Sequence, residues 1–128
     1  MSEMAFDPYP VAAAKGLLVV EPGPFELFID ADSPGALTQM DTILAVLREH
    51  FPVDETRRTT SAGGNTHVYL FFPSQNLHYA PVLRCALQLA LGSDPKHELL
   101  SLVSILKQST TPPTVFFEKP SFTEEPVL

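Results

Sequence analysis

Two aspartates separated by one residue end an apolar segment, in the sequence FELFIDADSPG at residues 25–35. Because side chains alternate along a strand, Asp30 and Asp32 are predicted to point to the same side, with Cα atoms about 6.5 Å apart. Two carboxylates at that spacing can share one divalent cation or bridge two, and oxygen ligands favour Mg²⁺ or Mn²⁺. The pair therefore indicates a metal site of the kind that stabilises charge on a transferring phosphate.

Three other interpretations of this pair stay open. Asp32 can simply end the strand, with Asp30 solvated at its edge. The segment DADSPGALTQMD also imitates a calcium-binding loop at its first, third, sixth and twelfth positions, although Pro34 replaces the fifth ligand. The residues at those four positions are Asp30, Asp32, Gly35 and Asp41. Phosphatases with an aspartyl nucleophile also begin with D-x-D after a strand, but they usually have threonine or valine in place of Pro34 and a second acidic pair later.

A glycine-bearing loop followed by a histidine is the second stretch that could do chemistry, in the sequence TTSAGGNTHVYLFF at residues 59–72. Ser61, Gly63 and Gly64 form a loop whose amide groups can approach an anion closely. His67 then opens an apolar strand, where an imidazole can contact a phosphate or transfer a proton. A glycine turn followed by a half-buried strand histidine is the plainer alternative.

The order of these two stretches resembles the archaeo-eukaryotic primase and primase-polymerase superfamily. In that family a D-h-D motif ends a strand, and a small residue followed by histidine comes later, in a context such as T-P-S-G-G-x-H. The matching text here is FIDAD and TTSAGGNTH, with two residues instead of one between Gly64 and His67. The resemblance implies that Asp30 and Asp32 hold catalytic divalent metals and that His67 contacts the phosphates of the incoming nucleotide.

The third motif of the family is an acid after an apolar residue, which completes the metal site. Asp94, in LGSDPKHELLSL, is preferred on chain order, although it stands where a helix would be capped. Glu118, at the end of TVFFE, is the rival. The resemblance covers about residues 17–118.

The resulting prediction is a primase-polymerase-like nucleotidyltransferase that uses Mg²⁺ or Mn²⁺ to join nucleotides on a DNA or RNA template. Its predicted partners are nucleotides, the template and a larger replication-protein assembly. The alternative is a catalytically inactive primase-fold module whose acidic surface faces a protein partner. The predicted catalytic residues are Asp30, Asp32, His67 and Asp94; the nucleotide-binding residues are Ser61, Gly63, Gly64 and His67; the metal ligands are Asp30, Asp32 and Asp94.

Composition sets the class of protein. The 128 residues are 45% hydrophobic and 18% charged, which is typical of a globular domain, and one domain with its core at about residues 17–118 is expected. A net charge of −7 argues against coating nucleic acid with the whole surface, although a local basic patch around Arg57 and Arg58 stays possible. No apolar window is long enough to span a membrane, and a cytoplasmic location is expected. Cys85, the single cysteine, is predicted to be buried and inert.

The elements that must position these residues are predicted from local patterns. Ser33 and Pro34 begin a helix whose apolar stripe runs from Leu37 to Phe51. His97, at the start of a later helix, is predicted to be a surface residue. The expected fold is α+β: a small, mostly antiparallel sheet, of the RRM-like primase type, packed against about three helices. Strands are expected at 16–20 and 25–31 as a hairpin, at 54–60, at 67–73 and at 113–118; helices at 33–51, 78–92 and 94–108; loosely held tails at 1–15 and 119–128.

Overall fold

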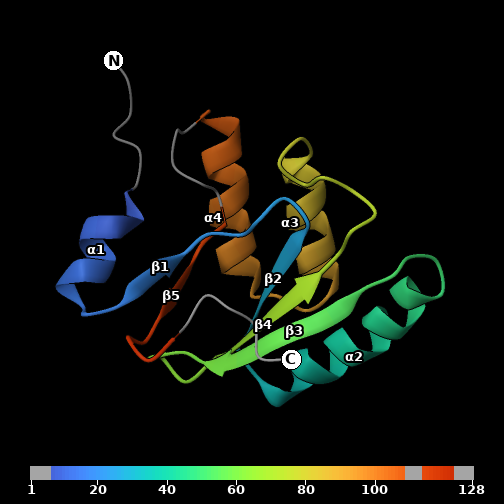
Figure 1. Cartoon of the computed structure of the whole chain (residues 1–128), viewed down its shortest axis with the longest axis horizontal. Helices are drawn as coiled ribbons and strands as arrows, with labels where there is room; N and C mark the ends of the chain where they lie inside the picture. The colour runs from blue at the N-terminus through green and yellow to red at the C-terminus, as the bar shows by residue number, and fades with distance from the viewer. Residues whose placement is uncertain (1–6, 109–113, 123–128) are drawn as a thin grey trace.

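The computed structural model describes residues 7–108 and 114–122, and it confirms the α+β class. The described part has four helices, a three-stranded antiparallel sheet in the order β2-β4-β3 and a two-stranded antiparallel ribbon, β1-β5 (Figure 1). The elements in chain order are α1 (Pro8–Ala14), β1 (Leu18–Val20), β2 (Glu26–Ala31), α2 (Pro34–Arg48), β3 (Asp54–Thr60), β4 (Thr66–Phe71), α3 (Pro81–Ala90), α4 (Pro95–Leu106) and β5 (Phe116–Glu118). None of these helices is both long and apolar enough to cross a membrane.

The helix predicted from Ser33 is confirmed as α2. The Ser33 hydroxyl accepts a hydrogen bond from the Ala36 amide at 3.1 Å, and Pro34 is the first helical residue. Met40 and Leu44 of the helix are buried in the core, whereas Phe51 lies beyond the end of the helix and is exposed. The capping and periodicity signals therefore found this helix correctly, and its end lies three residues earlier than expected.

The predicted hairpin between residues 16–20 and 25–31 is wrong. Strand β1 pairs with β5, so that Val20 lies opposite Phe116, and β2 pairs with β4. The turn residues between β1 and β2 bond to the segment after β4 instead: the Phe25 carbonyl accepts from the Phe72 amide at 2.7 Å, and the Pro24 carbonyl accepts from Leu77. The turn therefore passes the chain from the ribbon to the sheet.

The three-stranded sheet has two different faces. Leu27, Ile29, Val68 and Leu70 form an apolar core with the buried residues of α2. The opposite face carries Phe28 and Tyr69, which pack against Val20 and Phe116 of the β1-β5 ribbon. The sheet thus lies between α2 and the ribbon, with α3 and α4 standing beyond the β2 edge (Figure 1).

The outer edge of β2 is covered by side chains instead of another strand. The Phe28 amide donates to Gln88 Oε1 at 2.8 Å, and the Asp30 amide donates to Ser93 Oγ at 3.0 Å. Gln88 and Ser93 both donate in turn to Glu98, which is 1% exposed. An unpaired strand edge would leave buried amides unsatisfied, so this network fixes β2 in place.

The segment before β1 contains a helix, where the sequence interpretation expected a loosely held tail at 1–15. Residues 1–6 lie outside the described part, but α1 follows them, with Asp7 Oδ1 accepting from the Tyr9 amide at 3.0 Å. The short polar signal "DPYP" combines a cap and a proline at the first helical position, and the sequence interpretation overlooked it. Of the predicted C-terminal tail, residues 123–128 lie outside the described part.

Candidate functional site

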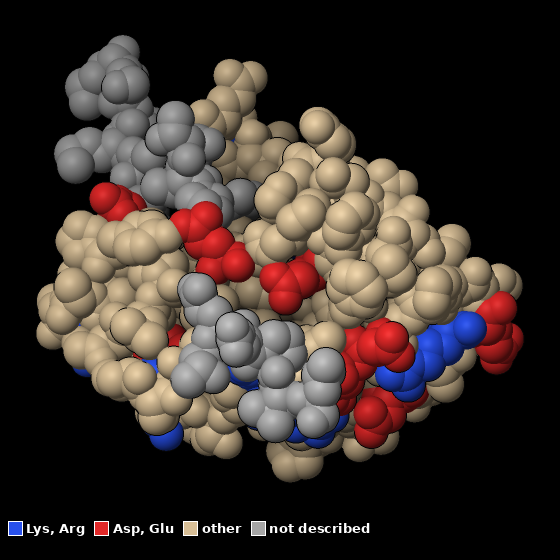
Figure 2. Space-filling model, viewed as in Figure 1, with Lys and Arg blue, Asp and Glu red and all other residues tan. Residues whose placement is uncertain are grey.

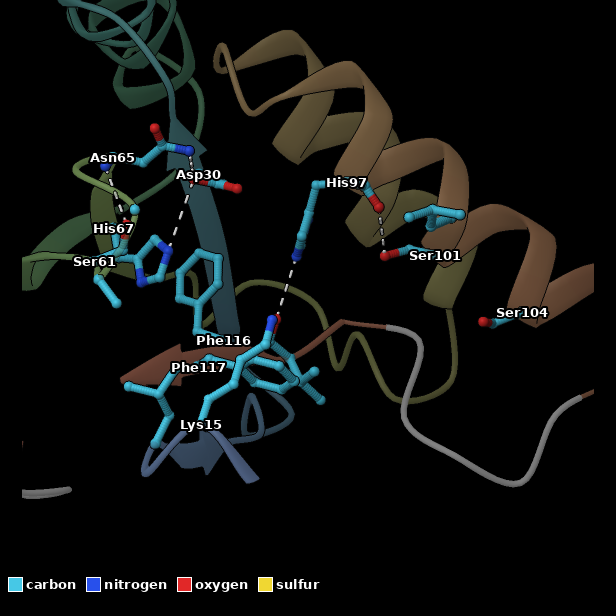
Figure 3. Close-up of a pocket in the computed structure, with 15 residues that line it drawn as sticks. Lys15, Asp30, Ser61, Asn65, His67, His97, Ser101, Ser104, Phe116 and Phe117 are labelled. Carbon is cyan, nitrogen blue, oxygen red and sulfur yellow. Dashed lines mark hydrogen bonds and ion pairs between the residues drawn. The ribbon is translucent and has the colours of Figure 1, made fainter. Parts of the chain in front are cut away.

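A pocket of about 550 Å³ opens between β2, the loop after β3, α4 and β5 (Figure 3). Its polar lining residues come from five separate segments of the chain, and its apolar lining lies on the α1–β1 turn, α4 and β5. The polar residues include Lys15, Asp30, Ser61, Asn65, His67 and His97, and the apolar residues include Leu17, Leu100, Val115 and Phe117. A concave site with an apolar wall and a few converging polar groups is the usual form of a small-molecule site.

Asp30 lies at the inner end of this pocket, one residue before β2 ends, and is 9% exposed. Its Oδ1 accepts a hydrogen bond from Asn65 Nδ2 at 3.2 Å and lies 3.7 Å from His67 Nε2. Its other carboxylate oxygen makes no hydrogen bond within the described residues, and Figure 3 shows it pointing across the pocket toward α4. One oxygen of Asp30 is therefore available to a ligand.

His67 is placed opposite Asp30 by the register of β2 and β4. Its Nδ1 lies 3.0 Å from Glu118 Oε2, and its ring stacks on Phe116 with a centroid separation of 3.8 Å. Because a carboxylate can only accept hydrogen bonds, Nδ1 carries the proton and donates. Nε2 is thus the ring nitrogen that faces Asp30 and the pocket.

Glu118 fixes that arrangement from within the core. It is 1% exposed and accepts hydrogen bonds from Thr59 Oγ1, at 2.8 and 3.0 Å, from the Tyr69 hydroxyl and from His67. Burial alone raises the pKa of a carboxyl group, but these donors outweigh it and hold the pKa of Glu118 below its ordinary value. Burial and the bond to Glu118 raise the pKa of Tyr69, which keeps its proton. Glu118 is therefore an ionised carboxylate that accepts hydrogen bonds from three donors.

The loop between β3 and β4 folds as a closed turn beside Asp30. Ser61 Oγ accepts from the Asn65 amide at 3.0 Å, and the Gly64 amide donates to the Ser61 carbonyl at 3.0 Å. Gly64 has φ +88°, a conformation that favours glycine. The amides of Ala62 and Gly63 make no hydrogen bond within the described residues, so they can donate to an anion in the pocket.

The structure brings some predicted residues together and leaves others apart. Asp30, His67, Ser61 and Gly63 line the pocket, whereas Gly64 does not and turns its amide inward. Asp32 is exposed, because β2 ends at Ala31 and the next residues lead into the α2 cap, so the strand alternation that predicted a shared side stops before it.

Of the two candidates for the third acid, only Glu118 contacts the site. Asp94 caps α4, with Oδ1 accepting from the Lys96 amide at 3.0 Å, and it does not line the pocket. Its backbone amide donates to the Asp30 carbonyl at 2.8 Å, so Asp94 supports the pocket through its main chain. Glu118 reaches the pocket through His67.

His97 was predicted to lie at the surface, and this is wrong. Its side chain is 22% exposed and lines the pocket, because the first turn of α4 packs against the segment that enters β5. Nδ1 lies 3.1 Å from Glu98 Oε2 and Nε2 lies 3.2 Å from the Val115 carbonyl. Burial opposes the charged form, but the bonds and charge of Glu98 and the Val115 carbonyl outweigh it and raise the pKa of His97. Both ring nitrogens face acceptors, so the protonated ring satisfies both.

The donor set was tested against the divalent cation that the family resemblance implies. Within the described residues no group of three or more His, Cys, Asp or Glu side chains is arranged to hold a metal ion. Asp30 offers one carboxylate oxygen to the pocket, with Asp32 just beyond the strand. A single carboxylate oxygen fits Mg²⁺ only where water and substrate phosphates supply the remaining ligands, which is common for this ion.

Comparisons of the chain with protein-family models, with curated proteins and with solved structures find no match. The functional argument therefore rests on the residues of this pocket. Several of them, including Lys15, Asn65 and His97, were not among the predicted site residues.

Proposed function

We propose that the chain is a metal-dependent nucleotidyltransferase of the primase-polymerase type, which joins nucleotides on a DNA or RNA template. The observation that carries this proposal is the meeting of Asp30 and His67, opposite one another in register, with the free amides of Ala62 and Gly63 in one pocket. The two stretches that resemble the family motifs are thereby neighbours in space as well as in order.

The topology supports the proposal in part. The order β2-α2-β3-β4-α3, with β4 central, agrees with the first part of an RRM-like β-α-β-β-α-β core. The last strand departs from that pattern, since β5 pairs with β1 and lies on the face of the sheet. This departure is what brings Glu118 over His67.

Charge decides how a nucleotide can bind here. A triphosphate and the Asp30 carboxylate repel one another, so a cation must lie between them. The free carboxylate oxygen of Asp30 would hold that divalent ion, which would stabilise the negative charge on the reacting phosphate. Lys15 adds positive charge on another wall of the pocket.

The protein's own groups would orient the phosphates. His67 presents Nε2 to the pocket because Glu118 holds Nδ1, and Nε2 can donate to a phosphate oxygen only in the imidazolium form, with both ring nitrogens protonated. The free amides of Ala62 and Gly63 can donate to the same group. The apolar wall that includes Phe117 offers a surface for the base, and the pocket volume of about 550 Å³ suits a nucleotide.

The test is primer synthesis and extension with nucleotides and Mg²⁺ or Mn²⁺. Asp30→Asn keeps the size of the side chain and the oxygen that Asn65 contacts, and it is expected to reduce extension by about 100-fold or more. Asp41→Asn removes an exposed acid on α2 and serves as the matched control. Equal activity in the wild-type chain and Asp30→Asn would contradict the proposal.

A second candidate is a binding module that has kept the pocket without turnover. It is favoured by the positions of Asp94, which caps α4, and Asp32, which lies outside the pocket. Such a module would gain thermal stability from a nucleotide with Mn²⁺, as a native-state ligand must give, but would not extend a primer. The same gain, together with extension lost in Asp30→Asn, would support the enzyme.

A further inference from the structure

A second, basic groove lies beside the pocket, and we propose that it binds the phosphodiester backbone of a single-stranded nucleic acid. The groove measures about 440 Å³ and is lined by β3, the end of β5 and the residues that follow it, including Arg57, Thr60, Glu118, Lys119, Ser121 and Phe122. The inference extends the proposed function, and the description of the bound nucleic acid as a template rests on that function.

Arg57 supplies the first argument. It lies on β3, opposite Tyr69, and no acidic side chain in the described part pairs with it. Its Nη2 is buried and has no hydrogen-bond partner, and its guanidinium lies 4.3 Å from the centroid of the Phe122 ring. A buried charged donor without a partner is costly and calls for a ligand or water, and a phosphate oxygen is a strong partner for a guanidinium.

Lys119 supplies the second cation. It follows Glu118 at the end of β5, is exposed, and forms no ion pair within residues 7–108 and 114–122. Arg58 also lines the groove, but Glu55 holds its guanidinium at 2.8 Å. The negative charge of Glu118 is buried and engaged by its three donors. Glu118 keeps its own negative charge, but within the described residues no acidic side chain forms an ion pair with Arg57 or Lys119.

The surroundings favour a single strand over a duplex or an acidic peptide. Figure 2 shows Lys and Arg along the lower edge and at the right of this face, with Asp and Glu beside them at the right and in the middle, and the chain carries a net charge of −7. Two free cations match neighbouring phosphates of one strand, whereas a duplex presents more phosphates to a wider acidic surface. Thr60 and Ser121 add hydroxyl donors, and Phe122 adds an aromatic ring of the kind on which bases stack.

The position of the groove relative to the pocket gives the third argument. Phe116 and Phe117 of β5 line the pocket, and the next two residues, Glu118 and Lys119, line the groove. Glu118 also bonds to His67. A strand lying along the groove would pass directly beside the pocket, where a template must meet an incoming nucleotide.

The test is fluorescence anisotropy with a short labelled oligothymidylate, using the full chain without nucleotide or divalent ion. With two phosphate contacts, a plot of the logarithm of the binding constant against the logarithm of the salt concentration is expected to have a slope of about −1.4. A fourfold rise in salt concentration then weakens binding about 7-fold. Arg57→Gln or Lys119→Gln is expected to halve the slope, so that the same rise weakens binding about 2.6-fold. Lys96→Gln removes an exposed lysine at the start of α4 and should behave as the wild-type chain.

The competing outcomes are distinguishable. Binding by the Arg57→Gln, Lys119→Gln double variant at wild-type strength would overturn the inference, and urea unfolding checks that this variant folds. Equal competition by inorganic phosphate or by polyglutamate would also overturn it, in favour of a simple anion or an acidic peptide. Asp30→Asn should still bind the oligonucleotide; if it does while extension is absent in every protein, the groove stands and the enzymatic proposal fails.

Discussion

Replacing Glu118 by glutamine tests whether this buried carboxylate positions His67. The glutamine oxygen can take the bonds from His67 and Tyr69, and the Thr59 hydroxyl can rotate to accept from the amide. The side chain keeps its size, but the bonds lose the strength that an ionised acceptor gives, about 1 kcal/mol each. We therefore expect Glu118→Gln to lower the free energy of unfolding by about 2 kcal/mol.

Glu118→Ala should cost more, because its donors are then left buried without an acceptor. At about 1–3 kcal/mol for each unsatisfied group, three donors give a loss of about 3–9 kcal/mol. Glu55→Gln is the matched control, since Glu55 pairs with Arg58 at the surface, with side-chain exposures of 32% and 41%. An exposed pair of this kind contributes about 1 kcal/mol or less.

The assay is urea unfolding followed by circular dichroism, combined with ¹⁵N NMR of the His67 ring. The wild-type chain should show the Nδ1–H form, and Glu118→Gln should weaken that preference, which a merely structural role would not do.

The contribution of Glu118 to stability should depend on pH with a definite sign. Because the pKa of Glu118 is lowered in the native state, its contribution is present above the ordinary value of 4.5 and is lost as the pH falls through the native pKa. Glu118→Gln as stable as Glu55→Gln, with His67 unchanged, would refute this reasoning.

Three further predictions concern other parts of the fold. The pKa of His97 is raised above 6.5, so its pairing with Glu98 should stabilise the protein fully below pH 6.5, and this stabilisation should be lost as the pH rises through the native pKa. The midpoint of urea unfolding should therefore fall over this pH range, and it should fall less in His97→Gln. Gly92→Ala should cost about 2–4 kcal/mol in urea unfolding, since φ is +91° and a Cβ would lie 2.7 Å from the Ala36 carbonyl oxygen. Cys85 is buried and burial raises its thiol pKa to about 11, so a disulfide reagent should react only after unfolding, and rapid labelling of the native chain would contradict its burial.

Local signals in the sequence predicted local structure well. A cap, a proline and an apolar stripe sufficed for α2 because each signal acts within one or two helical turns. The burial of Cys85 also followed from its apolar helical surroundings and is confirmed. The pairing of β1 with β5 could not be predicted in this way. Val20 and Phe116 lie opposite one another, but all three strands of the main sheet lie between them in the sequence. The turn sequence EPGP is compatible with a hairpin and with a crossing between layers.

The residues of the pocket also fall into those that local sequence signals predicted and those that only tertiary packing places there. Asp30 and His67 could be placed together from their two motifs, and the register of β2 and β4 sets them opposite one another. Chain order favoured Asp94, but its position before Pro95 was already a sufficient signal for a helix cap. Lys15 and His97 carry no motif; they belong to the pocket because α1 and α4 pack around it, which only the tertiary structure determines.

The distribution of buried polar groups indicates what the structure is built to hold. The face of the sheet that packs on α2 has an apolar core, whereas buried carboxylates gather around the pocket: Glu118 beneath His67, and Glu98 behind Asp30 and His97. Burying a carboxylate is costly, and well-packed apolar residues are often as stabilising or more so. These two networks therefore position His67 and Asp30 more than they stabilise the folded protein. One fixes the tautomer of His67, and the other fixes the strand that carries Asp30, so these two neighbouring groups of the pocket are held independently of one another.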